Sequence, residues 1–165
     1  MQSIRIYEIP DCKMVSSGVG MFGDGTLEKF DKWLSMQPRE IYPRDFLYWD
    51  SSSDEKQGFN WLYVYEEGMS VPDEFPIVSF HGGLYAVATD IDQKTNKEVM
   101  ESELNIFLID NGFERDTSRP ELGNIITSPH AKETLGYEQM NYWFPIRKNH
   151  EGVDEHALHF RNPTP

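Results

Sequence analysis

Met140-Asn141-Tyr142-Trp143-Phe144-Pro145-Ile146 has a near copy earlier in the chain, Phe59-Asn60-Trp61-Leu62-Tyr63-Val64-Tyr65. Each stretch has a large apolar residue, an asparagine, an aromatic residue and then an apolar run. Aromatic and β-branched residues suit a pleated, half-buried surface, so both stretches are predicted to be β-strands. A polar amide at the same place in two apolar strands indicates a duplicated unit. The two strands are expected to face each other across an internal twofold axis, with a ligand at the seam.

The residues before the earlier strand predict a strand, a helix and a second strand. Residues 4–9 alternate apolar and polar side chains, and this strand is expected to continue past a kink through 13–16. Thr26 is placed as the N-cap of a helix over 27–34. Residues 45–49 form the next predicted strand. The first half therefore has the order β-α-β-β.

The residues before the later strand repeat this order. Residues 77–89 predict a strand bent at its Gly-Gly pair. Thr95 begins a capping box, and Gly112 stands where a helix ends. Residues 122–127 form a shorter predicted strand, and 129–136 are expected to be a loop. The second half is again β-α-β-β.

These elements predict an α+β fold of duplicated modules, covering about 3–68 and 74–148. The modules would share one mainly antiparallel sheet, with helices on one side and a central groove. Residues 1–150 would form a single domain, and 151–165 a polar C-terminal tail.

Composition narrows the class of function. Lys and Arg number 15 against 28 Asp and Glu, which gives a formal net charge of −13. Such a chain repels phosphate backbones, so direct binding of nucleic acid is not expected. The charge would attract cationic small molecules, or it serves only solubility. Cys12 is the only cysteine, which leaves no disulfide and no cysteine-rich metal site. Without a leader or a long apolar run, we expect a cytoplasmic protein that does not enter a membrane.

Several segments resemble the GyrI-like effector-binding family. This small-molecule-binding domain occurs behind DNA-binding domains in bacterial AraC- and MerR-type transcription regulators, and also as free-standing proteins. The segments that carry the resemblance are Tyr7-Glu8-Ile9-Pro10, Tyr42-Pro43-Arg44-Asp45-Phe46, Gly82-Gly83-Leu84-Tyr85-Ala86-Val87, Asn111-Gly112-Phe113-Glu114-Arg115-Asp116, Arg119-Pro120-Glu121-Leu122 and Asn141-Tyr142-Trp143-Phe144-Pro145-Ile146. Their order and spacing cover most of residues 3–148, which favours a free-standing member.

The resemblance implies a groove for aromatic, often cationic, drug-like compounds, as in multidrug binding. In the family's last strand, a Glu four residues before the Pro meets the positive charge of the ligand, and here that position is Asn141. An amide can form hydrogen bonds, but it cannot neutralise a cation or act as a general base. The resemblance also implies hydrolytic activity in some free-standing members.

The candidate ligand contacts are amide, aromatic and acidic side chains near the predicted groove. They are Asn60, Trp61, Tyr63, Tyr85, Glu103, Asn141 and Trp143. Alternation along a strand places Asn141 on the same face as Trp143. The alternative for each amide is a bond to a neighbouring backbone, and for each aromatic residue core packing. Glu103 reaches the groove from the second helix or is a solvated acid.

No catalytic residue, metal site or cofactor is predicted. His81 keeps a haem-binding alternative open. The leading hypothesis is a non-catalytic protein that binds an aromatic or amphipathic small molecule, cationic ones included, for sensing or sequestration. The alternatives are a hydrolase that acts on a reactive hydrophobic compound, and a protein-interaction or inhibitor module whose partner is another protein or a DNA-binding regulator.

Overall fold

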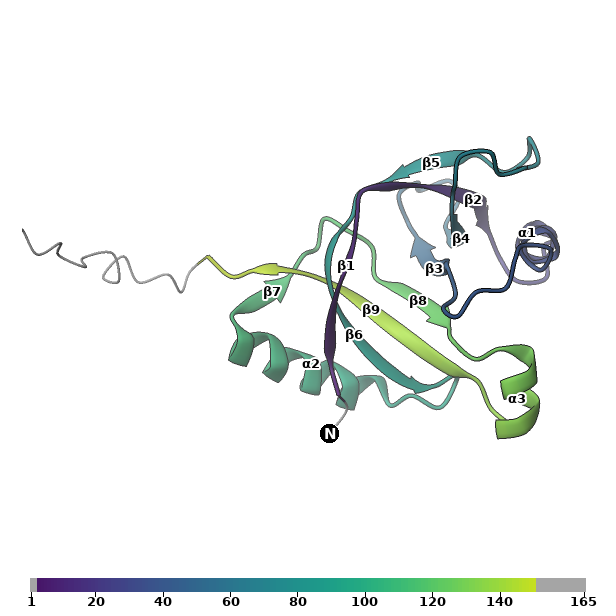
Figure 1. Ribbon diagram of the computed structural model, residues 1–165. Coiled ribbons are helices and arrows are strands. Elements are labelled where there is room, and N and C mark those ends of the chain that lie inside the picture. The colour runs from purple at the N-terminus through teal and green to yellow at the C-terminus, as the bar shows by residue number, and fades with distance from the viewer. Residues whose placement is uncertain (1–2, 151–165) are drawn as a thin grey trace, which may run out of the picture.

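The computed structural model describes residues 3–150, which form one curled sheet with helices packed on it (Figure 1). The strands are β1 (Arg5–Ile9), β2 (Cys12–Gly20), β3 (Asp45–Asp50), β4 (Gly58–Val64), β5 (Ile77–Phe80), β6 (Gly83–Ile91), β7 (Phe113–Arg115), β8 (Leu122–Ile125) and β9 (Gln139–Lys148). The helices are α1 (Thr26–Leu34), α2 (Lys97–Asn111) and α3 (Pro129–Leu135). The predicted tail, 151–165, lies outside the described residues.

The order of the strands confirms the duplicated α+β fold. They pair as β1-β6-β9-β8-β3-β4-β2-β5, all antiparallel, and β7 pairs with the end of β9. The modules β2-α1-β3-β4 and β6-α2-β8-β9 are related by an axis between β3 and β8, where Leu47 lies opposite Gly123. The two near-copy strands, β4 and β9, correspond across this axis but do not adjoin. The expected seam between them is wrong, because the middle strands of the two modules, β3 and β8, lie at the centre.

The two halves exchange the strands that precede these modules, β1 and β5, and this curls the sheet. β1 comes from the first half but pairs with β6, whereas β5 comes from the second half but pairs with β2. Only Pro10 and Asp11 separate β1 from β2. Because so short a linker spans at most about 10 Å, the two ends of the sheet must come together. The sheet therefore curls, with an inner face inside the curl and an outer face away from it.

Apolar side chains cover both faces. The inner face carries one buried cluster: Ile9, Met14, Phe46, Leu62, Phe80, Tyr85, Val87 and Leu122. On the outer face, α1 packs Phe30 and Trp33 against Tyr63 of β4, and α2 packs Leu104 and Leu108 against β6 and β9. Both helices thus lie on one side of the sheet, as predicted. None of the helices within residues 3–150 combines the length and apolar character needed to cross a bilayer.

The first turns of α1 and α2 differ by one residue from the prediction. The N-cap of α1 is Gly25, in a left-handed conformation, and Thr26 is already helical. The N-cap of α2 is Asn96, whose side chain accepts a hydrogen bond from the Val99 amide at 3.1 Å, and not Thr95. An asparagine oxygen caps a helix as well as a threonine oxygen, so the sequence alone does not decide between neighbours.

Residues 129–136, predicted as a loop, form α3. The Ser128 hydroxyl accepts a hydrogen bond from the Ala131 amide at 3.2 Å, Pro129 occupies the first turn, and left-handed Gly136 ends the helix. All three are ordinary helix-terminus signals. The prediction was wrong because so short a helix, with no buried residue, leaves no apolar periodicity in the sequence.

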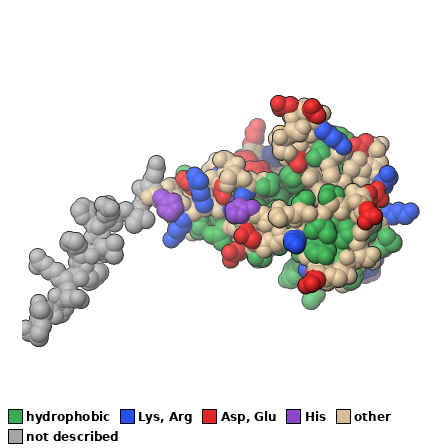
Figure 2. Space-filling model, turned by 90° about the horizontal axis from the view of Figure 1, so that it is seen from above, with side chains coloured by type: hydrophobic (Ala, Val, Ile, Leu, Met, Phe, Trp, Pro, Cys, Tyr) green, Lys and Arg blue, Asp and Glu red, His purple; other side chains and the backbone are tan. Residues whose placement is uncertain are grey.

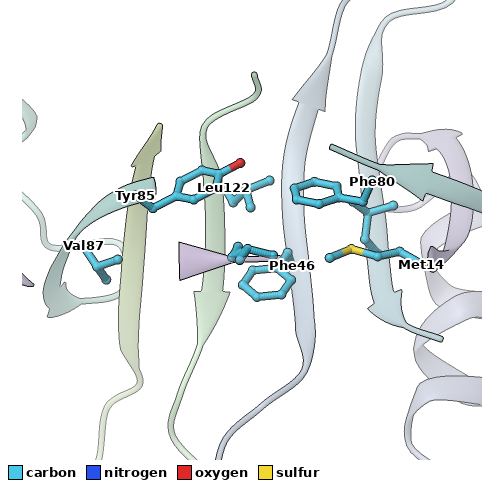
Figure 3. Packing of buried hydrophobic residues seen from close by; sticks show 8 residues of the cluster. Met14, Phe46, Phe80, Tyr85, Val87 and Leu122 are labelled. Carbon is cyan, nitrogen blue, oxygen red and sulfur yellow. The ribbon is translucent and has the colours of Figure 1, made fainter. Parts of the chain in front are cut away.

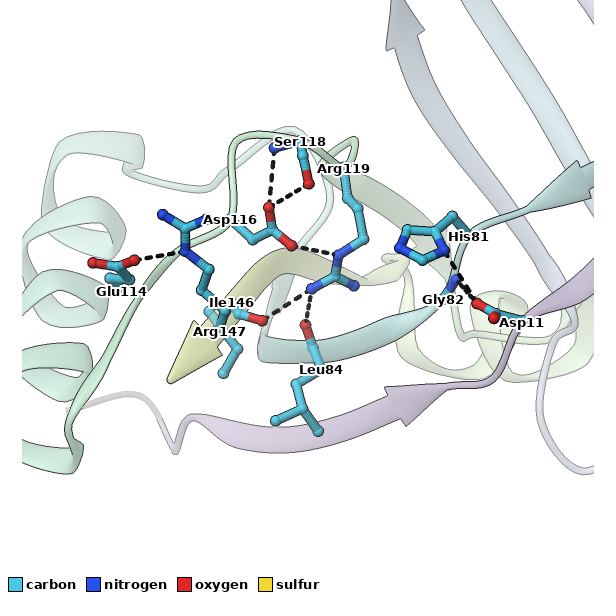
Figure 4. Close-up of polar contacts among 10 residues, drawn as sticks. All are labelled: Asp11, His81, Gly82, Leu84, Glu114, Asp116, Ser118, Arg119, Ile146 and Arg147. Atoms are coloured by element: carbon cyan, nitrogen blue, oxygen red, sulfur yellow. Dashed lines mark hydrogen bonds and ion pairs between the residues drawn. The ribbon is translucent and has the colours of Figure 1, made fainter. Parts of the chain in front are cut away.

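Arg119 holds the ends of β6 and β9 together (Figure 4). Its Nη2 donates to the carbonyl oxygens of Leu84 and Ile146 at 2.8 and 2.9 Å, and its Nε donates to Asp116 Oδ2 at 2.8 Å. The β6–β9 pairing ends at Pro145, which has no N–H to donate. The guanidinium therefore supplies hydrogen-bond donors where the ladder of backbone bonds stops.

Candidate functional site

The structure divides the candidate ligand contacts between the two faces of the sheet. The inner face holds the two amides, one tyrosine and one tryptophan: Asn60, Tyr85, Asn141 and Trp143. The outer face holds the rest: Trp61, Tyr63 and Glu103. Because successive side chains of a strand point to opposite faces, these two groups cannot contact one ligand together.

The outer aromatic residues pack in the core. Tyr63 is buried edge-on against Trp33, with ring centroids 5.8 Å apart. The Trp61 indole Nε1 donates to Asp45 Oδ2 at 2.8 Å. The contacts of Trp61 and Tyr63 are therefore those of core residues, which was the alternative to ligand contact for each aromatic side chain. Glu103 is half-buried on α2, on the side of the sheet opposite to Asn141.

Asp45 gives a pH-dependent prediction. Burial raises the pKa of this carboxyl group, and the Trp61 hydrogen bond only partly offsets the rise. A raised folded-state pKa means that the stability contribution is complete below about pH 4 and is lost as the pH rises through the folded value. Asp45→Asn, which keeps an oxygen for Trp61, should raise the free energy of unfolding at pH 7 by about 1 kcal/mol. Urea unfolding at pH 3 and pH 7 tests this; a variant less stable than wild type at pH 7 contradicts it.

On the inner face, the two amides have equivalent surroundings. Asn60 Oδ1 accepts a hydrogen bond from the Ser16 hydroxyl at 2.7 Å, and Asn141 Oδ1 accepts one from the Thr89 hydroxyl at 2.6 Å. In both cases the hydroxyl comes from the neighbouring strand, β2 or β6. Asn141 Oδ1 also accepts a bond of 3.5 Å from Arg5 Nη2. The twofold relation of the modules therefore extends to their polar side chains.

A carboxylate that sequence reasoning missed lies beside Asn60. Asp50 Oδ2 accepts hydrogen bonds from the Tyr48 hydroxyl at 3.1 Å and from Asn60 Nδ2 at 3.4 Å. Burial opposes ionisation of Asp50, but hydrogen bonds from Ser52, Asn60 and Tyr48 outweigh it and lower its pKa. Burial and the nearby Asp50 charge raise the pKa of Tyr48 to about 12. Alternation along β3 from buried Phe46 was the signal that could have found Asp50.

Trp143 is half-buried among aromatic rings. Its ring centroid lies 5.4 Å from that of Phe46, 6.0 Å from Tyr85 and 5.6 Å from Tyr7. Its Nε1 donates to the Asn124 Oδ1 at 2.8 Å. Neither Tyr7 nor Asn124 was predicted, because the pairing of β1 with β6 and of β8 with β9 joins residues distant in sequence. Trp143 thus has a fixed ring with part of its surface accessible.

The interior behind Trp143 is filled (Figure 3). Tyr85 is fully buried, and its ring extends toward Leu122 within the inner cluster. Burial raises the pKa of the Tyr85 hydroxyl, and the nearby Arg119 guanidinium partly offsets the rise. A ligand could reach Tyr85 only if the cluster opened. One accessible part of the inner face is its edge at β1, where Arg5 and Tyr7 are exposed and Thr89 and Trp143 are half-buried around the buried Asn141. We call these five residues the rim.

A pocket of about 360 Å³ lies elsewhere, on the helix side, between the segment after α1 and the segment after β8. We call it the seam pocket. The residues that line it include Ile41, Tyr42, Asp45, Tyr63 and Ile126. A second pocket of about 370 Å³ adjoins it and shares Tyr63. Of the candidate ligand contacts, only Tyr63 lines either of them.

No protein-family model matches this chain, and no curated protein matches it significantly. Solved structures do. The C-terminal domain of EcmrR gives a TM-score of 0.57 at 16% identity, covering 90% of this chain and 99% of that one. A hydrolase from Listeria innocua gives a TM-score of 0.63 at 11% identity, covering 88% of this chain and 92% of the hydrolase chain. SAV2435, in a structure bound to tetraphenylphosphonium, gives a TM-score of 0.55 at 11% identity, covering 96% of this chain and 99% of the SAV2435 chain.

The chain has the fold of a GyrI-like small-molecule-binding domain. The resemblance drawn from its motifs is thus confirmed for the fold. At the position where GyrI-like domains are expected to present a Glu to a cationic ligand, this chain presents Asn141, with the Arg5 guanidinium in hydrogen-bonding distance. The charged group next to this position is therefore the Arg5 guanidinium, which is positive.

Proposed function

We propose that residues 1–150 act as one ligand-binding domain, which takes up an aromatic or amphipathic small molecule at the rim, for sensing or sequestration. The observation that carries the proposal is the half-buried Trp143 indole beside the Asn141 amide, at the accessible edge of a closed apolar face. Ligand sites combine apolar surface with a few placed polar groups in this way. The binding of tetraphenylphosphonium by SAV2435, which has the same fold, supports a small-molecule role.

Apolar burial against Trp143 and Tyr7 would supply most of the affinity. Each Å² of apolar surface removed from water contributes about 25 cal/mol before the costs of association. The Thr89 and Asn141 side chains would orient the ligand through hydrogen bonds. The Tyr7 and Trp143 rings contact each other as a tilted pair with centroids 5.6 Å apart, so a flat ligand ring would lie against their accessible surface.

Tryptophan fluorescence tests the site directly. Planar aromatic compounds that bind at the rim should quench the emission of the wild-type chain. Trp143→Phe should abolish most of that quenching, and Asn141→Leu should weaken binding about fivefold to tenfold, the usual worth of one hydrogen bond. Trp49→Phe is the matched control, because Trp49 is half exposed and lies on the outer face. Quenching that is lost with Trp49 and kept without Trp143 would refute the rim as the site.

The seam pocket defines the other outcome of this titration. Its volume lies in the range of small-molecule sites, and Tyr42 in its lining is 78% exposed. Binding that survives both Trp143→Phe and Asn141→Leu but is lost in Tyr42→Ser would place the ligand in the seam pocket. The small-molecule function would then stand and the rim assignment would fall.

Hydrolysis is the second candidate function. It is favoured by the Asp50 carboxylate beside Tyr48 and Asn60, and by the Listeria innocua neighbour described as a hydrolase. The lowered pKa of Asp50 argues against an efficient general base near neutral pH. Release of p-nitrophenol from p-nitrophenyl esters, lost in Asp50→Asn and kept in Asp54→Asn, would establish hydrolysis. Equal rates in both variants would remove it.

A protein-interaction role is the third candidate. Its basis is the filled inner cluster together with apolar residues exposed on one side of α2: Val99, Ile106 and Ile109. Figure 2 shows that hydrophobic side chains are also exposed between charged ones on the face seen from above. A second copy of the chain is the simplest partner. Sedimentation that depends on concentration in the wild type and not in Ile106→Glu would support it.

A further inference from the structure

We infer that the ligand taken at the rim is an anionic aromatic compound, such as an aryl carboxylate, and that Arg5 selects its charge. The inference rests on the proposed function and names its ligand class. It reverses the charge preference that the GyrI-like resemblance implies, and it is carried by side chains of β1, β6 and β9.

Arg5 stands where the charge of a bound ligand would be sensed. Its Nη2 donates to the Thr89 hydroxyl at 2.5 Å and to Asn141 Oδ1 at 3.5 Å. Its Cζ lies 5.7 Å from the centroid of the Tyr7 ring, which in turn contacts Trp143. In register, Arg5 lies opposite Val87, and Val87 lies opposite Trp143. The guanidinium and the accessible indole are therefore two strands apart along one row.

Arg5 has no carboxylate partner within residues 3–150. Both of its acceptors are neutral oxygens. The chain has a net charge of −13, and most other arginines among residues 3–150 form ion pairs, for example Arg44 with Glu66, Arg115 with Glu121, and Arg119 with Asp116. A guanidinium held by neutral groups keeps N–H donors available, in a planar arrangement that matches a carboxylate.

The acids nearest in sequence do not compensate this charge. Glu8 has the opposite parity to Arg5 and Tyr7 along β1, so it points to the other face of the sheet. Asp90 follows Thr89 along β6, so it also points to the other face of the sheet, and it accepts a hydrogen bond from the Ile91 amide at 2.7 Å. A cationic ligand at the rim would thus meet a like charge, which is unfavourable at contact distance.

The overall negative charge does not exclude an anion. Charges more than about 8 Å from the ligand are largely screened at physiological salt, whereas a carboxylate in contact with Arg5 is not. A charged hydrogen bond is also stronger than a neutral one. The local guanidinium therefore decides the sign, with the ring of the ligand on Trp143 and Tyr7 and its carboxylate at Arg5.

The test uses three probes with one ring system and different charges: 2-naphthoate, 2-naphthamide and 2-naphthylmethylammonium. Titrations of the whole chain by tryptophan fluorescence should give the tightest binding for naphthoate and the weakest for the ammonium. Arg5→Gln should weaken naphthoate about tenfold and naphthamide less than about twofold. Arg5→Lys, which keeps the charge without the planar fork, should recover part of the naphthoate affinity.

Lys29→Gln is the matched control, because it changes the net charge equally at an exposed position of α1. Equal weakening by Lys29→Gln and Arg5→Gln would mean a general field effect and would overturn the role of Arg5. Tightest binding of the ammonium probe, or naphthoate binding unchanged by both Arg5 variants, would overturn it as well and leave the proposed function standing. No Trp143-dependent response to any probe would overturn the rim as the ligand site of the proposed function.

Discussion

Arg119→Leu should lower the free energy of unfolding by about 3–5 kcal/mol, the cost of breaking a buried ion pair. The Arg119 and Asp116 side chains are only 4% and 13% exposed, and the pair is joined by a bond of 2.8 Å. Removing the guanidinium leaves the Asp116 carboxylate without its cation, and leaves the carbonyl oxygens of Leu84 and Ile146 without these donors. Urea unfolding measured by circular dichroism gives the difference.

The control for this variant is Arg147→Gln. Arg147 also forms an ion pair, with Glu114 at 2.6 Å, but its side chain is 60% exposed. Exposed pairs contribute at most about 1 kcal/mol. Similar losses in the two variants would mean that Arg119 acts only as an ordinary surface charge, and would contradict its role in joining β6 to β9.

The Asp116 carboxylate, which pairs with Arg119, also makes the stability of the fold depend on pH in the acid range. Hydrogen bonds from the Ser118 hydroxyl and from Arg119 hold the pKa of Asp116 well below its usual range. A lowered folded-state pKa means that the stabilisation is complete above about pH 4 and is lost as the pH falls through the folded value. Asp116→Asn should therefore be less stable than wild type at pH 7, and the gap should narrow steadily below pH 4. A gap that stays constant from pH 7 to pH 2.5 would contradict this titration.

Strand content and the order of the modules could be predicted because they depend on local patterns. The aromatic runs of β4 and β9, the apolar stripe of α1 and the Gly112 terminus of α2 each lie within one short window. The exchange of β1 and β5 between the two halves could not be predicted, because no local pattern indicates which distant strand β1 or β5 pairs with. That exchange adds Ile9 of β1 and Phe80 of β5 to the buried inner cluster, on the face where a groove was expected.

The candidate site was predictable in part for the same reason. Alternation along β9 correctly placed Asn141 and Trp143 on one face. The residues that give the rim its charge and its second ring, Arg5 and Tyr7, come from the exchanged strand, so only the three-dimensional structure brings them to Trp143. Arg119 lies within one of the segments that resemble the family, but arginine is rarely buried, and nothing in the surrounding sequence predicts a buried ion pair.

Gly82→Ala should destabilise the chain by about 3 kcal/mol, at the upper end of ordinary overpacking costs. A Cβ at Gly82 would lie 2.0 Å from the carbonyl oxygen of Ile9 and 2.5 Å from the carbonyl carbon of Pro10. Both are backbone atoms at the corner where β1 turns into β2, and the Gly82 amide is tied there to Asp11 by a hydrogen bond of 2.8 Å. Backbone on both sides leaves no side chain that can move away.

Gly123→Ala is the contrasting variant, and it should cost less than about 1.5 kcal/mol. Its Cβ would meet only the terminal Met140 Cε closely, at 2.2 Å, and a methionine side chain can change rotamer. Thermal unfolding of both variants measures the difference. Because the Gly82 clash pushes on the end of β1, Gly82→Ala should also displace Arg5 and Tyr7 and reduce naphthoate binding, whereas Gly123→Ala should leave it intact. Equal stability losses in the two variants, or full binding in Gly82→Ala, would mean that the β1 corner does not hold the rim in place.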